Sequence, residues 1–226
     1  MTRSAAALCL GAVSAAAETL YYTAHWRGMT AGIASIDFSD GGARLTLETT
    51  GFVGRLYKVK DVYTVNFNGS GCAEKSLMEA EEGKRREEIR VSYTGGKVAS
   101  FHRDLVRKKD EVKEMPAPDC NYEVIAALRR LRGAPPEIGR SVEYPMANER
   151  KVARVKVEAQ RIEWIRKAPT IRYEAHLMNN VLYRRSGHLH VWLTQDARRI
   201  PVRVRVRMPF YIGTVTLELS EAPPPS

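Results

Sequence analysis

Two histidines have the spacing that most resembles a metal site. His188 and His190 are separated by one residue in a stretch that alternates like a strand. On a strand, residues i and i+2 point to the same side roughly 7 Å apart, so two imidazoles there can share one ion. Zinc needs at least a third ligand, and Asp196 or a distant histidine would supply one only through the fold. We therefore expect two half-exposed histidines beside Trp192, with no metal and no cofactor bound.

A row of arginines is the second candidate site. Arg203, Arg205 and Arg207 alternate with valines, which is the period of a strand with one buried and one solvated face. With Arg199 the row would span roughly 25 Å. Guanidinium groups bind phosphate and carboxylate, so the row favours an anionic ligand. The alternative is a solvated outer face that is balanced by acidic side chains on neighbouring strands, such as Glu218.

Motifs for catalysis are missing from the sequence. It contains no G-x-S-x-G motif for a nucleophilic serine, and its aspartates are scattered rather than paired. The glycines at 69, 71, 95 and 96 lie between predicted strands rather than before a helix, which argues against a nucleotide site. We expect no enzymatic activity. A metal-assisted hydrolase that uses the two histidines is the enzymatic alternative.

The charge of the chain indicates the class of its partners. The 226 residues carry a formal net charge of +10, and 44% of them are hydrophobic, enough for a core without metal. A basic protein of this kind favours envelope lipid, acidic polysaccharide or an acidic protein partner. We exclude nucleic acid, because the arginines are not interleaved with aromatic residues for stacking and because the chain is predicted to be exported.

The first 17 residues have the layout of a secretory signal peptide. Arg3 precedes the short apolar run 5–13, and alanines at 15–17 provide a cleavage site. The run is too short for a transmembrane anchor. We expect a periplasmic protein in which residues 18–221 form a single β-rich domain and residues 222–226 a disordered tail. The oligomeric state stays open.

Two cysteines remain after the predicted cleavage. Cys72 and Cys120 form an even pair in an oxidising compartment, which favours one disulfide. Closing that loop would stabilise the fold by about 4 kcal/mol on the chain-entropy model. The alternative is two unrelated free thiols.

The elements that position these residues are almost all strands. Alternating segments separated by glycine turns run through the chain, and 187–219 alone reads as three strands. One helix is predicted, with Asp119 as its N-cap and Gly133 after its end. The charged run 107–114 reads as a solvated strand end or loop. We therefore predict a mainly β fold: a single large antiparallel sheet of about twelve strands, curved or closed into an incomplete barrel, with one short helix packed against it.

Several segments resemble the bacterial family called domain of unknown function 3108. They are Trp26-x-Gly28-x-x-Ala31-Gly32, Leu56-Tyr57-x-Val59-x-Asp61-x-Tyr63, the helix that begins at Asp119 and carries Leu128-Arg129, and Trp192-Leu193-Thr194-x-Asp196-x-Arg198-Arg199-Ile200-Pro201-Val202 followed by Gly213-x-Val215. The resemblance implies an exported protein with a curved antiparallel sheet and provides no catalytic residues. The two histidines are not part of the family pattern.

The residues of this resemblance admit structural roles. Gly28 and Gly32 suit a tight turn, Pro201 suits the start of a strand, and Asp196 with Arg198 would close a turn by hydrogen bonding. The function we expect is a periplasmic protein that binds an apolar, amphipathic or anionic envelope component in or on its curved sheet. The alternative is a structural or assembly factor of the envelope that acts through protein contacts.

Overall fold

The computed structural model describes residues 17–147, 152–177, 188–207 and 213–222. The predicted signal peptide, except for its last residue, and nearly all of the predicted tail lie outside these ranges. The described residues form one antiparallel sheet of fourteen strands with two helices. The N-terminal half contains β1 (Glu18–Trp26), β2 (Met29–Ser39), β3 (Gly42–Thr49), α1 (Gly51–Leu56), β4 (Val59–Phe67), β5 (Ala73–Glu82), β6 (Arg85–Thr94), β7 (Lys97–Asp104) and β8 (Lys109–Pro116). The C-terminal half contains α2 (Val124–Arg132), β9 (Ser141–Ala147), β10 (Val152–Ile165), β11 (Ala168–Leu177), β12 (His188–Thr194), β13 (Pro201–Arg207) and β14 (Thr214–Ser220).

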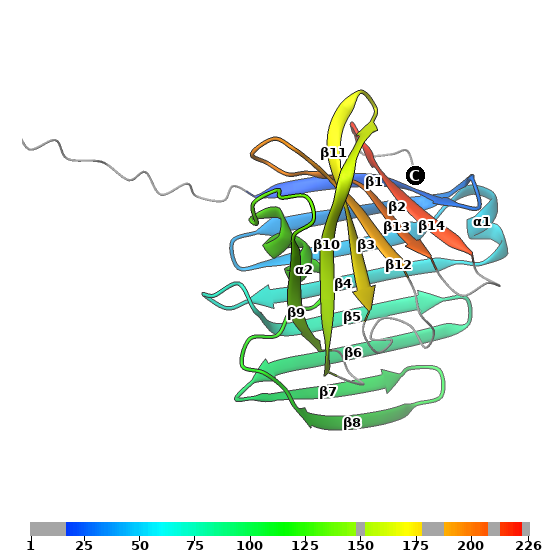
Figure 1. Cartoon of the computed structure of the whole chain (residues 1–226). Helices are drawn as coiled ribbons and strands as arrows, with labels where there is room; N and C mark the ends of the chain where they lie inside the picture. The colour runs from blue at the N-terminus through cyan, green and yellow to red at the C-terminus, as the bar shows by residue number, and fades with distance from the viewer. Residues whose placement is uncertain (1–16, 148–151, 178–187, 208–212, 223–226) are drawn as a thin grey trace, which may run out of the picture.

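The sheet is a meander whose ends do not meet. Each strand pairs with its neighbour in the chain, except that β8 and β9 do not pair and β1 pairs with β14. The order is therefore β8 to β1 followed by β14 to β9, with β8 and β9 as the two edges. Figure 1 shows β1 to β8 as a broad layer, with β9 to β12 crossing in front of it and α2 beside β9. The fold class predicted from the sequence is confirmed.

Alternating burial explains why these segments form strands. In β2, Ala34, Ile36 and Phe38 are buried and alternate with more exposed residues. Such a period of two gives one strand face to the core and the other to solvent. We call the side of the sheet that faces α2 the inner face and the opposite side the outer face.

Helix α2 packs against both halves of the inner face. Its residues Ile125 and Ala126 belong to one apolar cluster with side chains of β1 to β7. Leu131, almost two turns later, belongs to a second cluster with side chains of β9 to β12. The helix therefore lies between the two halves and removes apolar surface of both from water, which is the main stabilising contribution to such a core.

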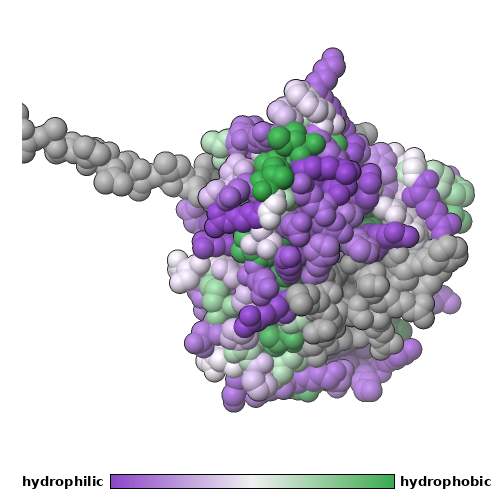
Figure 2. All heavy atoms as spheres, viewed as in Figure 1, coloured by the Kyte–Doolittle hydropathy of each residue, from purple (hydrophilic) through white to green (hydrophobic). Residues whose placement is uncertain are grey.

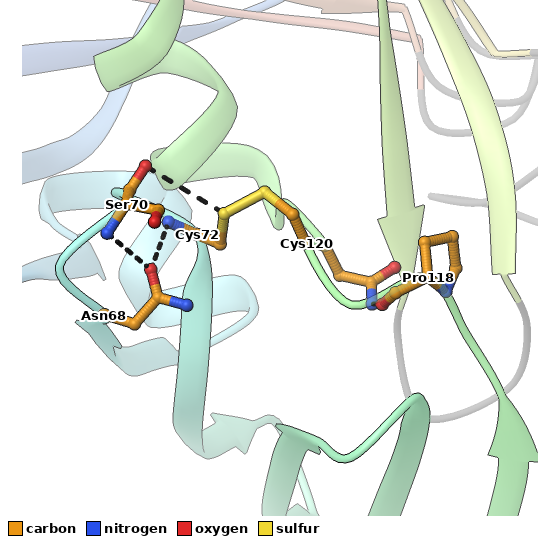
Figure 3. The surroundings of a disulfide bond; sticks show 6 residues. Asn68, Ser70, Cys72, Pro118 and Cys120 are labelled. Atoms are coloured by element: carbon orange, nitrogen blue, oxygen red, sulfur yellow. Dashed lines mark hydrogen bonds between the residues drawn. A yellow bond between two sulfur atoms is a disulfide. The ribbon is translucent and has the colours of Figure 1, made fainter.

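A disulfide attaches the segment before α2 to β5. Cys72 and Cys120 are bonded, with their Cα atoms 5.3 Å apart (Figure 3). The Asn68 side chain accepts hydrogen bonds from the backbone amides of Ser70 and Cys72, which orders the turn on the β5 side. The Ala73 amide also donates to the Asn121 carbonyl across the same junction. The disulfide predicted from the cysteine pair is therefore present, and it holds the start of α2 on the sheet.

The edge strand β8 is protected by its charges. All its residues except Met115 are exposed, and its sequence KDEVKEMP alternates positive and negative side chains before a proline. Charge and proline on an edge strand oppose pairing with another chain. The run 107–114, predicted as a solvated strand end or loop, is this edge and the turn before it.

The structure differs from the predicted elements in three ways. The described residues form fourteen strands rather than about twelve, and the charged segment β8 is one of them. Residues 51–56 form a second helix, α1, in addition to the one predicted. Asp119 is not the N-cap of α2: that role belongs to Glu123, whose side chain accepts from the amides of Ile125 and Ala126. No described helix is long and apolar enough to cross a bilayer.

Candidate functional site

Trp192 is the centre of a charged network on the outer face. It alternates in β12 with Val191 and Leu193, which belong to the inner core, so its ring lies on the outer side. Its Nε1 donates to Glu163 Oε2 at 2.8 Å. The guanidinium groups of Arg203 and Arg205 lie over its ring, 5.7 and 5.3 Å from the centroid. The arginine stems cover the indole, which is only 2% exposed.

Two glutamates neutralise much of this network. Glu163 pairs with Arg161 at 2.7 Å and with Arg172 at 3.4 Å. Glu218 pairs with Arg203 at 2.7 Å. Burial alone would raise the pKa of Glu163, but the Trp192 hydrogen bond and the neighbouring arginines outweigh it and hold that pKa below its ordinary value.

The arginine row is therefore shorter and less available than predicted. Arg203, Arg205 and Arg207 share the outer face, and Arg203 is neutralised by Glu218, the acidic residue named for the alternative interpretation. Arg199 does not continue the row. It lies in the turn before β13, is buried, and donates through Nη2 to the Tyr173 hydroxyl at 2.5 Å on the inner side. A positive φ in that turn reverses the chain and directs this side chain inward.

The histidine pair shares a carboxylate rather than completing a metal site. His188 and His190 have stacked rings with centroids 6.4 Å apart, as expected for one face of a strand. Both face Glu174, at 3.1 and 3.6 Å from its Oε1. Burial lowers the pKa of His190 more than the Glu174 charge raises it. Within the described ranges, no group of three or more His, Cys, Asp or Glu side chains is arranged to hold a metal ion.

The turn between β12 and β13 has the geometry expected of its motif. Asp196 Oδ1 accepts from the amides of Arg198 and Arg199 at 3.1 and 3.0 Å and from the Thr194 hydroxyl at 2.8 Å. Pro201 begins β13, as predicted. The Pro201 carbonyl accepts from the buried Tyr22 hydroxyl at 2.9 Å, which ties this turn to β1.

The two glycines of the first hairpin have different roles. Gly28 has a φ of +83°, which fits the predicted tight turn beside Trp26. Gly32 lies inside β2 and has no such backbone requirement. A Cβ there would lie 2.2 Å from the Glu48 carbonyl oxygen, so Gly32 permits the close approach of β3. The prediction that Gly32 serves a turn is wrong.

A buried carboxyl lies where α2 meets the inner face. Glu123 is 5% exposed and accepts from the amides of Ile125 and Ala126 at 2.8 and 2.5 Å. Burial raises its pKa to about 7, against the opposing effect of these amides and of a hydrogen bond with Tyr63. Tyr63 was predicted only as a structural motif residue. Its own pKa is raised well above the ordinary value, first by burial and then by the Glu123 charge.

Two further buried hydroxyl groups, those of Tyr93 and Ser76, lie on the inner face. Tyr93 belongs to the same apolar cluster as Ile125 and Ala126 of α2. Its hydroxyl is 3.4 Å from the Ser76 hydroxyl and donates to the Ala147 carbonyl at 3.4 Å. The inner face at this point is therefore apolar with a few hydrogen-bonding groups, an arrangement typical of small-molecule sites.

Asp61 begins a second set of ionisable groups on the inner face. In the strand register it lies opposite Ala80, which lies opposite Glu87 on β6. Burial and then the Glu82 charge raise the pKa of Asp61 to about 6. Glu87 is buried too, but Arg85 and His102 pair with it, the latter at 3.0 Å, and together they hold its pKa below the ordinary value.

Sequence reasoning missed most of these inner residues. Only Asp61 and Tyr63 were named, and only for their place in a motif. The available signal was Glu123 directly before the apolar run 124–128, a position that suits an N-cap but ranked below Asp119. The pairing of Glu87 with His102 carried no local signal, because it requires the register of β6 against β7.

Comparisons with known proteins agree with this architecture. Residues 21–220 match the family model described as a protein of unknown function, DUF3108. A crystal structure of a beta-barrel-like protein of DUF1849 from Brucella abortus superposes with a TM-score of 0.63 at 8% identity, over 90% of this chain and 95% of that one. At this identity the likeness concerns the fold alone. No curated protein matches the sequence. The chain, matched over nearly its whole length, belongs to the DUF3108 family.

Proposed function

We propose that this protein is an exported, non-enzymatic binding protein of the cell envelope that holds an amphipathic molecule against the inner face of its sheet. The observation that carries the proposal is the position of Glu123 and Asp61. Glu123 lies against the apolar inner surface and Asp61 lies beside the ionisable groups of the same face, and their pKa values are raised to about 7 and about 6. Perturbed groups of this kind mark candidate functional sites. A protonated carboxyl there would donate a hydrogen bond to a polar head group, while the apolar lining contacts the rest of the ligand.

Ligand entry requires α2 to move in this proposal. Glu123 is only 5% exposed beneath the helix, and a pocket farther along α2, near Leu131 and Tyr173, measures about 40 Å³, whereas ligand pockets usually exceed about 300 Å³. The helix is attached to the turn before β13 and to β1 by side chains. Arg132 donates to the Arg199 carbonyl at 3.2 Å and pairs with Glu18 at 2.6 Å. Breaking these contacts leaves the strand ladders intact.

The discriminating measurement starts from protein purified from cells that export it. Native mass spectrometry should detect an extra mass that organic extraction identifies as an amphipathic molecule. A dansyl-labelled fatty acid then serves as a probe in solution. Arg132→Ala, which loosens the end of α2, should bind this probe several-fold more tightly than the parent protein.

Arg130→Ala is the matched control, because Arg130 is exposed on the same helix. It should leave binding of the probe unchanged. Absence of any copurified amphiphile, together with identical probe binding by the parent, Arg132→Ala and Arg130→Ala proteins, would refute the proposal.

The alternative of an assembly factor is limited by one feature of the sheet, the charged edge strand β8. An assembly factor that added a partner strand would use an exposed edge, but β8 carries charges along its length and ends in a proline. Such a role would have to use the other edge strand, β9, or a different surface.

A further inference from the structure

Helix α1 is an apolar helix with no buried residue. Its sequence is GFVGRL, and Phe52 and Leu56 are each 66% exposed. Tyr57, directly after the helix, is 53% exposed. Phe52 and Leu56 lie four residues apart in the helix and so share one face, and Tyr57 follows them as the C-cap residue with an extended backbone. A large apolar side chain in water contributes nothing to the core, so this face needs a separate explanation.

The neighbouring hairpin enlarges the apolar surface. The Thr50 amide before α1 donates to the Ala31 carbonyl of β2 at 3.0 Å, so α1 lies beside the start of β2. Met29, the first residue of β2, is also about half exposed. Figure 2 shows green spheres at the right-hand edge, where Figure 1 places α1. We call Met29, Phe52, Leu56 and Tyr57 the α1 patch.

Positive charge surrounds the α1 patch. Arg27 precedes Met29 in the turn, Arg55 lies within α1, and Lys58 follows Tyr57. The helix has no acidic residue in its first turn and Arg55 in its last. Arg55 is exposed and forms no ion pair with any other described residue. Lys58 approaches Glu81 at 3.8 Å, but both side chains are largely exposed, so this pair neutralises little.

We propose that the α1 patch docks the protein onto an anionic lipid surface. Phe52 and Leu56 are both two-thirds exposed on a helix at the end of the strands, where their side chains can enter the acyl boundary of a bilayer. Tyr57 and the basic side chains suit the headgroup layer and its negative charge. The net charge of +10 adds attraction over longer range. This docking is independent of whether the inner face holds a ligand.

The opposite end of the sheet provides a comparison surface. The connection from β3 to β4 that contains α1 lies at one end of the strands, and the turn from β10 to β11 lies at the other, as the strand registers require. Trp164 beside that turn is 70% exposed, more than any residue of the α1 patch. Positive side chains lie here too: Arg161 pairs with Glu163, Arg166 approaches Glu218 at 3.7 Å, and Lys167 is exposed in the turn. Exposure of a single side chain would favour Trp164, whereas the number of large apolar side chains that are exposed near Arg55 favours α1.

The test measures cosedimentation with vesicles. Protein exported to the periplasm of an expression host is purified and mixed with vesicles of phosphatidylglycerol and phosphatidylethanolamine, or of phosphatidylcholine alone. The parent protein should bind the anionic vesicles and bind neutral vesicles far more weakly. Phe52→Ser with Leu56→Ser should lower the partition coefficient at least tenfold, because two large apolar contacts are lost.

Two further variants separate electrostatic attraction from nonspecific hydrophobic adhesion. Arg55→Glu should weaken binding to anionic vesicles several-fold and leave the residual binding to neutral vesicles unchanged. Trp164→Ser is the matched control and should leave partitioning unchanged. Thermal unfolding of each variant should match the parent, since none of the substituted residues is buried.

Three results would overturn the docking proposal. The first is failure of the parent protein to bind either type of vesicle. The second is an equal loss of binding in Trp164→Ser and in the α1 double variant, which would indicate general adhesion. The third is a parent dimer, detected by light scattering, that becomes a monomer in the α1 double variant, which would assign the patch to a second copy of the chain. Because the double variant leaves the inner face untouched, its binding of the dansyl fatty acid tests the proposed function separately.

Discussion

Glu163 on the outer face and Glu123 against the inner face are both withdrawn from much of the solvent, yet their pKa values move in opposite directions. Glu163 has an indole N–H and two arginines around it, so its charged form is favoured. Glu123 has two amides and a tyrosine hydroxyl but no cation pairs with it among the described residues, so burial dominates. Neighbouring cations therefore decide the direction of the shift: they lower the pKa of Glu163, and of Glu87 on the inner face, whereas Glu123 has none within the described ranges.

This difference explains why the arginines are weaker functional candidates than their sequence pattern indicates. An arginine that already pairs with a glutamate must lose that pair before it binds an external anion. A protonated carboxyl in an apolar surface has no such competing pair. The inner face therefore has more capacity to respond to a ligand or to pH than the outer face.

Removal of the disulfide, which holds α2 on the inner face, should lower the free energy of unfolding more than any other change considered below. The variant with both Cys72→Ser and Cys120→Ser loses a crosslink over 48 residues, and we expect the free energy of unfolding to fall by about 4 kcal/mol. Urea denaturation measures the total. Hydrogen exchange should show a greater loss of protection in α2 than in β12, because the bond holds the start of α2. Equal loss in both elements would contradict this role.

Glu123→Gln should change the pH dependence of stability. The folded pKa of Glu123 is about 7 and its ordinary value is 4.5, so the unfolded chain releases this proton first as the pH rises. The stabilising contribution is complete below about pH 4.5 and declines as the pH rises to 7, by about 3 kcal/mol. Unfolding measured between pH 4 and 8 should show this decline in the parent and a flatter profile in Glu123→Gln. An unchanged profile would place the titrating group elsewhere.

Glu163→Gln should show the opposite sign. Because the folded pKa of Glu163 is lowered, its contribution is present above the ordinary pKa and is lost as the pH falls through the lowered value. We expect the variant to be less stable by about 1 kcal/mol at pH 7, the usual scale for a hydrogen bond to a charged group. The difference should shrink as the pH falls below the ordinary pKa of 4.5. Glu174→Gln, in the same outer network, is the matched comparison, and a deficit that grew in acid would contradict the assignment.

The smallest expected effect concerns the arginines over Trp192. Arg203→Ala removes a pair with Glu218 and a cation–π contact, whereas Arg205→Ala removes the cation–π contact alone. We expect losses of about 1 kcal/mol and about 0.5 kcal/mol in the free energy of unfolding. Only the larger loss should shrink at 1 M salt, since screening acts on the ion pair. Equal salt dependence of the two variants would show that the ion pair with Glu218 does not account for the difference between the two losses.

Local patterns predicted much of the fold. The alternation of valine and arginine in 202–207 predicted β13, and the glycine turns predicted most hairpins, because strand faces and turn backbones depend on neighbouring residues. Helix α1 was not predicted, because none of its six residues is buried and it therefore lacks the apolar periodicity of a helix that packs on a core. The cap of α2 lies four residues after the predicted one, because aspartate is a preferred N-cap residue type and glutamate is not, and only the packing of α2 selects Glu123.

Much less of the candidate site could be predicted from the sequence. Glu123 meets Tyr63, and Glu87 meets His102, only through the order of strands and the placement of α2. Arg199 illustrates the same limit. It has the spacing of the arginine row, but one left-handed backbone conformation in the turn places it on the opposite face.

The sequence by itself determined the strand-rich class, the turn at Asp196 and the family resemblance, because each depends on residue types at short spacing; it favoured a disulfide between Cys72 and Cys120 without deciding it. Tertiary structure alone decided which charges are neutralised and which carboxyls hold a proton. Those properties depend on burial and on neighbours that are distant in the chain, and electrostatic interactions follow distances in space rather than separation in sequence.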